Sequence, residues 1–243
     1  MKRVVLPVIT GVVLLLLWSF AVRFSGTKIF PSPLDVVRAI ASLAEKSLLW
    51  SYIRDSLWRV AAGYVTAVLI GIPIGMMLGW FKTLERAVNP LVQLLRPISP
   101  LAWMPLAVIW FGVSNLAPMF LIFLATLFPI IVATANAVRN VPPMYLQAAR
   151  NFGLSTPAIL RRVVFPAVLP QILVSLRIAF GVAWLVLVAS EMIAVDSGLG
   201  YLIIDARNAG KRYDLVVAGM LLIGVIGLLL DYGFRRFEFQ ERG

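Results

Sequence analysis

The chain has 243 residues, of which 61% are hydrophobic and 14% are charged, and its formal charge is +11. Soluble domains hold about 45–50% apolar and about 25% charged residues, so this composition excludes an ordinary soluble protein and indicates an all-α, polytopic membrane protein with one domain over residues 1–243. The absence of Cys and His excludes disulfides, cysteine nucleophiles, Ser-His-Asp triads and His-ligated metals.

The N-terminal segment begins with Met1-Lys2-Arg3 and continues as an apolar run from about Leu6 to Val22. A signal peptide is the alternative interpretation, but the run is long for a signal peptide and Arg23-Phe24-Ser25-Gly26 offers no small-residue cleavage site. We therefore expect a first transmembrane helix with its N-terminus in the cytoplasm.

An amphipathic helix is predicted from Ser32 to about Leu49. Ser32 can cap it, Pro33 suits the first helical position, and Asp35 lies in the first turn. Its apolar residues recur on one face while charged residues take the other, so the segment is too polar to span a bilayer. We expect it on the outer surface of the membrane.

The second predicted span runs from about Leu57 to Trp80. Pro73 should kink it, and Arg59 near its start is expected to reach the membrane surface. Small residues at four-residue spacing allow helices to approach closely in lipid. This spacing is seen at Gly71, Gly75 and Gly79.

A cytoplasmic loop carrying Lys82, Arg86 and Arg96 is predicted next. The apolar segment Pro97–Gly112 is short and interrupted by prolines, which is typical of cavity-lining segments in transporters, although a kinked packing helix fits equally well. A further bent span is predicted from Leu116 to about Val138.

The fifth predicted span begins near Pro166 or Pro170, ends near Ala194 and contains Arg177 and Glu191. These charges are 14 residues apart, a rise of about 21 Å, so they face one side of the helix and cannot pair with each other. Each needs a partner or water, because a charge in hydrocarbon costs about 2.5 kcal/mol or more. Two interpretations of Arg177 and Glu191 are open. Either they belong to a translocation path or an internal network, or their side chains reach the membrane faces.

The last span is predicted from Leu215 to about Leu230, after a polar outer loop over residues 196–214. With about six predicted spans, twelve Lys and Arg residues lie on the side of the N- and C-termini and eight lie on the other side. Arg59 and Arg177, within the spans, complete the 22. Cytoplasmic loops carry the excess of Lys and Arg, which places both termini and the segment around residues 140–166 in the cytoplasm. An anionic substrate or acidic partner is a second explanation of the positive charge.

The segment around residues 140–166 lies between two apolar runs and is predicted to form a bent pair of short helices, which we call the elbow. The first helix includes Gln147 to Arg150 and ends at Gly153, because glycine tolerates the left-handed conformation that follows a helix. The second has Thr156 as N-cap and Pro157 in the first position, and it should stop or kink by Pro166. Such a shape can dock into a groove of another protein, whereas the alternative is an ordinary loop.

The elbow resembles the "EAA" loop of ATP-binding-cassette importer permeases. That signature is Glu-Ala-Ala, three residues, Gly, nine residues and Ile-x-Leu-Pro; here Gln147-Ala148-Ala149, Gly153 and Val163-Val164-Phe165-Pro166 keep its spacing, with Gln147 in place of Glu. The resemblance implies a coupling helix that binds the ATPase subunit. The residues it assigns to coupling are Gln147, Ala148, Ala149, Arg150, Gly153, Leu154, Ser155 and Pro166.

Nearly the whole chain is similar to the nitrate, taurine and aliphatic-sulfonate branch of that family. The similarity includes residues 30–33, 96–105, 110–112, 176–181 and 190–194. It implies a permease homodimer in the bacterial cytoplasmic (inner) membrane, two ATPase subunits, an extracytoplasmic binding protein and a small, mostly anionic solute. The residues assigned to the translocation path are Trp103, Met104, Arg177, Trp184 and Glu191.

The chain lacks the Gly-x-x-x-x-Gly-Lys-Ser/Thr phosphate loop, so ATP and Mg are expected on the partner ATPase and no cofactor, metal or nucleic acid on this chain. An ion-coupled secondary transporter is an alternative, but only Glu191 is a clear intramembrane acid and the elbow would have no role. An intramembrane enzyme is a third hypothesis, although the scattered acids form no visible catalytic cluster.

Overall fold

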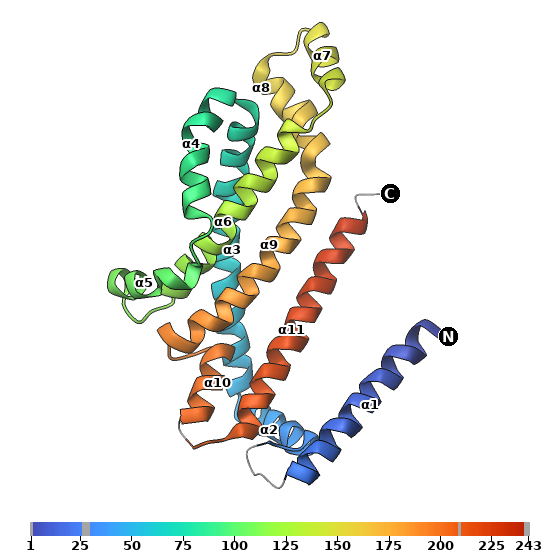
Figure 1. The fold of residues 1–243 in the computed structure, drawn as a ribbon, viewed down its shortest axis with the longest axis vertical. Helices are drawn as coiled ribbons and strands as arrows, with labels where there is room; N and C mark the ends of the chain where they lie inside the picture. The colour runs from blue at the N-terminus through green and yellow to red at the C-terminus, as the bar shows by residue number, and fades with distance from the viewer. Residues whose placement is uncertain (1, 26–29, 209, 241–243) are drawn as a thin grey trace.

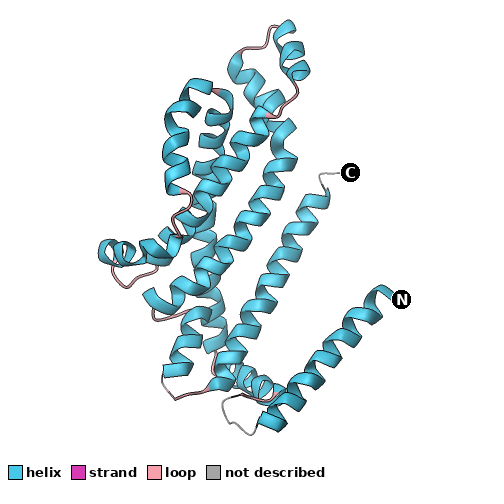
Figure 2. Ribbon diagram, viewed as in Figure 1, coloured by secondary structure: helices cyan, strands magenta, loops and turns pink. Residues whose placement is uncertain are grey.

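The computed structural model describes residues 2–25, 30–208 and 210–240, and all the regular secondary structure in these ranges is helical (Figure 2). The long helices run along the length of the molecule, with the elbow at one end and the short helices of residues 33–45 and 199–208 at the other (Figure 1). Helix α1 leans away from this bundle and touches it through α2.

The helices of the described ranges alternate long spans with short connecting elements. They are α1 (Lys2–Ser25), α2 (Pro33–Glu45), α3 (Leu48–Trp80), α4 (Lys82–Leu95), a 3-10 turn (Pro100–Trp103), α5 (Met104–Phe111), α6 (Leu116–Arg139), α7 (Pro143–Asn151), α8 (Thr156–Ile159), a π turn (Leu160–Val164), α9 (Phe165–Ala194), α10 (Leu199–Asn208) and α11 (Tyr213–Gln240).

Four stretches of the described chain are long and apolar enough to cross a membrane: Leu48–Trp80, Leu116–Arg139, Thr156–Ala194 and Tyr213–Arg236. Lys82–Leu95 and Pro100–Phe111, bent by 82°, make a fifth if they form one broken span. Within α1, Ile9–Phe24 is a shorter apolar helix. The described residues thus contain four or five spans, and a total of six stays a prediction.

The core of the bundle is the packing of α3 against α6. The three glycines at four-residue spacing in α3 each lie under a larger residue of α6, in the pairs Gly71 with Ile130, Gly75 with Thr134 and Gly79 with Val138. A Cβ built on Gly75 would lie 2.6 Å from the Cβ of Thr134 and 2.7 Å from the carbonyl oxygen of Ile131. The prediction that these glycines allow close helix approach is confirmed.

The predicted cap of α2 is also confirmed. The Ser32 hydroxyl accepts from the Asp35 amide, and the Asp35 carboxylate accepts from the Ser32 amide at 3.1 Å and from its hydroxyl at 2.7 Å. The hydrogen bond from the Ser32 side chain holds the pKa of Asp35 below its usual value. The apolar face of α2 packs Val36 and Ala39 against Ala218 of α11.

Three segments differ from the prediction, one in its start and two in being helical rather than loops. Helix α3 begins at Leu48 rather than Leu57, because the segment 48–56 packs against α2 and α10 as the first turns of the same helix. The predicted loop after Trp80 is helix α4, in which Leu84, Val88 and Val92 turn inward while Leu91 and Leu94 are exposed beside the polar residues. The polar segment 196–214 contains α10, which buries Leu199, Leu202 and Ile203.

Pro166 does not end the elbow's second helix, which continues into α9. The π turn Leu160–Val164 precedes it, and the Phe165 amide donates to the Leu160 carbonyl, five residues back. A π turn shifts the carbonyls that a proline ring would otherwise clash with. Thr156–Ala194 therefore forms one helical rod of 39 residues.

We predict that Gly75→Ala destabilises the α3–α6 pair, because its methyl group meets a backbone carbonyl that cannot move aside. The loss should be about 1–3 kcal/mol of unfolding free energy, the usual range for overpacking, seen as a lower melting temperature in detergent. Gly181→Ala is the matched control, since a Cβ at Gly181 meets no atom within 4 Å. Equal melting temperatures of the two variants would contradict the close-packing interpretation.

Candidate functional site

The elbow is the first candidate site, and its turn is built by backbone hydrogen bonds. Gly153 has φ +72°, and its amide donates to the Arg150 carbonyl at 2.9 Å while the Leu154 amide donates to the Ala149 carbonyl at 3.2 Å. These two bonds form a Schellman motif, which requires a left-handed residue after the helix. The prediction that Gly153 ends the first helix is confirmed.

The start of the elbow's second helix lies one residue earlier than predicted. Ser155, rather than Thr156, has the extended N-cap conformation, and the Ile159 amide donates to its carbonyl at 2.9 Å. Pro157 takes the second helical position, where a missing amide hydrogen is tolerated as well as in the first.

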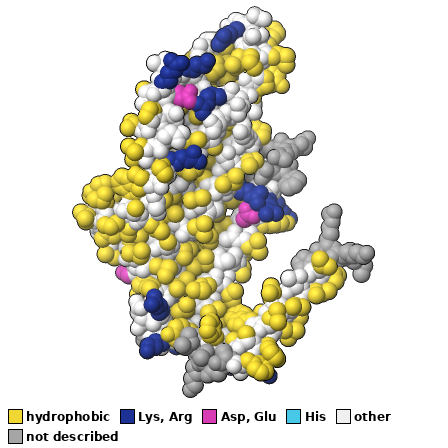
Figure 3. Space-filling view, viewed as in Figure 1, with side chains coloured by type: hydrophobic (Ala, Val, Ile, Leu, Met, Phe, Trp, Pro, Cys, Tyr) yellow, Lys and Arg dark blue, Asp and Glu magenta, His cyan; other side chains and the backbone are white. Residues whose placement is uncertain are grey.

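The elbow has one face packed on the bundle and one exposed face. Ala149 is buried in a cluster with Ile159, Val164 and Val138, which fixes α7 to the ends of α6 and α9. The opposite face exposes Gln147, Ala148 and, at the tip, three large apolar side chains: Met144, Tyr145 and Phe152. Phe152 is 87% exposed, and apolar side chains gather at this end of the molecule (Figure 3).

This apolar tip is a signal that the sequence reasoning missed, because it considered the polar residues and the EAA spacing. Exposed apolar residues gathered at one place indicate a surface for another protein. The elbow can therefore supply apolar contacts at its tip and hydrogen bonds at Gln147.

The second candidate site is a buried polar cluster at the other end of the molecule, centred on Arg59 and Glu191. Arg59 of α3 is 1% exposed and Glu191 of α9 is 0% exposed, and their Nη1 and Oε1 atoms are 2.7 Å apart. The Ser56 hydroxyl lies 2.8 Å from both carboxylate oxygens, and the Gly200 amide donates to Oε2 at 3.0 Å.

Arg59 also fixes two loops. Its Nε donates to Asn115 Oδ1 at 2.8 Å, and its Nη atoms donate to the carbonyl and hydroxyl oxygens of Ser197 at 2.7 and 2.6 Å. In the part of the chain that the structure describes, no buried side-chain nitrogen or oxygen lacks a hydrogen-bond partner. The prediction that Arg59 reaches the membrane surface is wrong, because Glu191 and Ser197 hold it inside the protein.

Arg177 lies midway along α9 and pairs with α11. Its Nε and Nη2 atoms donate to the Asp231 carboxylate at 2.7 and 3.1 Å, and Arg235 donates to the same carboxylate at 3.1 Å. Arg177 and Glu191 therefore have separate partners, as their spacing along the helix predicted. The Arg177 side chain is 28% exposed, whereas Glu191 is closed off.

The structure brings together only some of the residues assigned to the translocation path. Met104 and Trp184 are buried in the central apolar cluster, and the Trp184 indole donates to the Ile223 carbonyl at 3.3 Å. Trp103 is half-buried against that cluster. None of the described residues forms a group of three or more acids that could hold a metal ion.

The fold and these sites define a helical membrane protein of several spans with an exposed elbow for a protein partner. The sequence matches, over residues 71–242, the family model described as binding-protein-dependent transport system inner membrane component. The chain belongs to this family and is the permease subunit of an ATP-binding-cassette importer, a component that is not itself catalytic.

Named relatives are permeases for small solutes. The chain is 34% identical to the taurine transport system permease protein TauC of Escherichia coli K12, over 98% of this chain and 88% of that protein. It is 40% identical to the bicarbonate transport system permease protein CmpB of Synechococcus elongatus, over 77% of this chain and 67% of that protein. It is 38% identical to the nitrate import permease protein NrtB of Leptolyngbya laminosa, over 77% of this chain and 66% of that protein.

Solved importers share the fold. The inward-facing MetNI methionine transporter aligns with a TM-score of 0.70 and 18% identity, over 79% of this chain and 95% of that chain. A bacterial alginate transporter in complex with its pentasaccharide-bound periplasmic protein aligns with a TM-score of 0.65 and 18% identity, over 92% of each chain.

We predict that Arg59→Gln strongly destabilises the protein, because it leaves the Glu191 carboxylate buried without its counter-charge. Removal of one partner of a buried ion pair costs about 3–5 kcal/mol, measured here as a fall in melting temperature. Arg54→Gln is the control on the same helix, since Arg54 is 79% exposed and its pair with Asp55 is worth about 1 kcal/mol or less. Similar melting temperatures of the two variants would show that the buried pair is not a structural anchor.

Proposed function

We propose that two copies of this permease form a path for a small anionic solute in the bacterial inner membrane, with both termini in the cytoplasm. An extracytoplasmic binding protein delivers the solute, and two ATPase subunits bind the elbows. ATP and Mg are held and ATP is hydrolysed by those subunits, and this chain carries no cofactor. The solute class is supported by the names of the relatives, which include taurine, nitrate and bicarbonate permeases.

The single observation that carries the coupling role is the geometry of the elbow. A Schellman turn holds α7 at a fixed angle to a rod that continues through the membrane, so a force applied to the elbow moves α9 as a unit. Closure of the ATPase pair on ATP would draw the two elbows together and open the path outward, and hydrolysis would reset it. The coupling residues in this proposal are Gln147, Ala148, Ala149, Arg150, Gly153, Leu154, Ser155 and Pro166.

In this proposal the path residues have two roles. Arg177 and Trp103, which are partly exposed in the protomer, face the solute. Met104, Trp184 and Glu191, which are buried, support the wall behind them. An Arg guanidinium suits this role, because it binds oxyanions through paired N–H donors.

We predict that Gly153→Val abolishes solute-stimulated ATPase activity of the reconstituted importer without preventing membrane insertion. A Cβ at Gly153 meets no atom within 4 Å, so the effect must come from the φ of +72°, which a β-branched residue strongly resists. Gly153→Asn is the control of similar bulk and should keep most of the stimulation, because Asn adopts this conformation. Full stimulation with Val would refute the requirement for the turn.

We predict that Arg177→Gln lowers the uptake rate of the anionic solute by about tenfold, whereas Asp231→Asn lowers it less. Both changes break the α9–α11 ion pair, but only the first removes the positive charge that would bind the solute. Uptake is measured in proteoliposomes with the same binding protein. Equal losses in the two variants would mean that Arg177 serves only to hold α11 against α9.

A further inference from the structure

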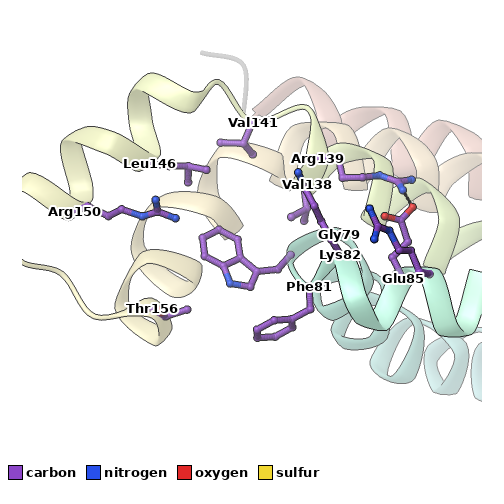
Figure 4. Close-up of a pocket in the computed structure, with 12 residues that line it drawn as sticks. Gly79, Phe81, Lys82, Glu85, Val138, Arg139, Val141, Leu146, Arg150 and Thr156 are labelled. Atoms are coloured by element: carbon purple, nitrogen blue, oxygen red, sulfur yellow. Dashed lines mark ion pairs between the residues drawn. The ribbon is translucent and has the colours of Figure 1, made fainter.

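A basic cleft lies between the elbow and the corner where α3 meets α4. Its volume is about 670 Å³, within the range of about 300–1,000 Å³ usual for ligand pockets. The walls come from α3, α4, α6, α7 and α8, with Arg139, Arg150, Lys82 and Glu85 around the opening (Figure 4). We call it the α3–α4 cleft.

Four cations and one carboxylate line this cleft, a formal balance of 4 − 1 = +3. Glu85 is already paired with Arg139, as the dashed line in Figure 4 marks. The side chains of Lys82, Arg86 and Arg150 make no hydrogen bond or ion pair with any other residue that the structure describes. Their charges are therefore available to an anion from outside the chain.

Arg150 connects the cleft to the elbow. In α7, Leu146 and Arg150 are one turn apart and both line the cleft, whereas Met144, Tyr145 and Phe152 lie on the exposed tip. The Arg150 guanidinium points away from its helix and into the cleft (Figure 4). A phosphate bound there would lie between one cation of the elbow and two cations of α4.

The cleft adjoins a surface for an acyl chain. Phe81, which lines it and directly follows α3, is the last of four exposed apolar residues at four-residue spacing: Leu69, Pro73, Met77 and Phe81. The twelve steps from residue 69 to residue 81 rise about 18 Å, slightly more than half of the hydrocarbon core of about 30 Å. The cleft and this stripe together match the headgroup and tail of one phospholipid.

We propose that the α3–α4 cleft binds the phosphate of an anionic phospholipid from the cytoplasmic leaflet, with its tail along the α3 stripe. Basic pockets between membrane helices on this side of a bilayer suit anionic headgroups. The bound lipid would hold the elbow against α4 through Arg150. The leaflet and the effect on the elbow rest on the proposed function, whereas lipid binding itself does not.

The test is native mass spectrometry of the purified permease in detergent, titrated with phosphatidylglycerol or phosphatidylcholine. The wild type should bind at least one phosphatidylglycerol about tenfold more tightly than phosphatidylcholine, and the double variant Arg86→Gln/Arg150→Gln should lose this preference. The control is Arg161→Gln/Arg162→Gln, which removes two exposed arginines at the same end of the molecule. These arginines do not line the cleft, so this variant should keep the preference for phosphatidylglycerol.

A second arm adds millimolar inorganic phosphate to distinguish the two sources of phosphate. Bound phosphatidylglycerol that survives this addition supports the lipid, because a tail on α3 adds affinity that a free ion lacks. Three results would each overturn the proposal. They are displacement of bound phosphatidylglycerol by phosphate, equal binding of the two lipids, and an equal loss of the phosphatidylglycerol preference in both double variants. The permease is tested without its ATPase, so a negative result leaves the coupling role of the elbow standing.

Discussion

The structure depends on the rule that a charge buried in a low-dielectric interior must be paired. Arg59 and Glu191 meet this rule through each other, through the hydrogen bonds that Ser56 and Gly200 donate to Glu191, and through those that Arg59 donates to Ser197 and Asn115. Because these groups come from α3, α9, α10 and the loop before α6, none of these elements can shift alone without breaking a buried bond. A Cβ at Gly198 would lie 2.5 Å from the Glu191 carboxylate, so the loop is also closed tightly over the pair.

The same helix that carries Glu191 also carries the elbow. The rod Thr156–Ala194 joins the elbow at one end to the buried pair at the other, and Arg177 fastens its middle to α11. A rod pinned in this way tilts more readily than it slides, because sliding would break both ion pairs at once. In the proposed coupling role, motion at the elbow would therefore be passed on as a rotation about the end held by Arg59.

Local features of this fold could be predicted from the sequence, whereas non-local partners could not. The Ser32 cap, the Gly153 turn and the close packing at Gly71, Gly75 and Gly79 each depend on residues within a few positions or on helical spacing. The partner of Arg59 lies 132 residues away, and no periodicity in the chain links the two. The π turn before Pro166 was missed because proline rules assume an α-helical register, and α10 was missed because its polar face hid a short apolar one.

The two ends of the molecule differ in how their charged side chains are paired. At the Arg59 end, every buried polar side chain among the described residues has a partner, so the elements there are fixed in one arrangement. At the elbow end, three cations of the α3–α4 cleft have none within the described chain. Like charges facing one another across a cleft repel unless an anion lies between them. An anion in the cleft would therefore hold the elbow near α4 in addition to the apolar contacts of Ala149, while the Arg59–Glu191 pair holds the far end of the same rod.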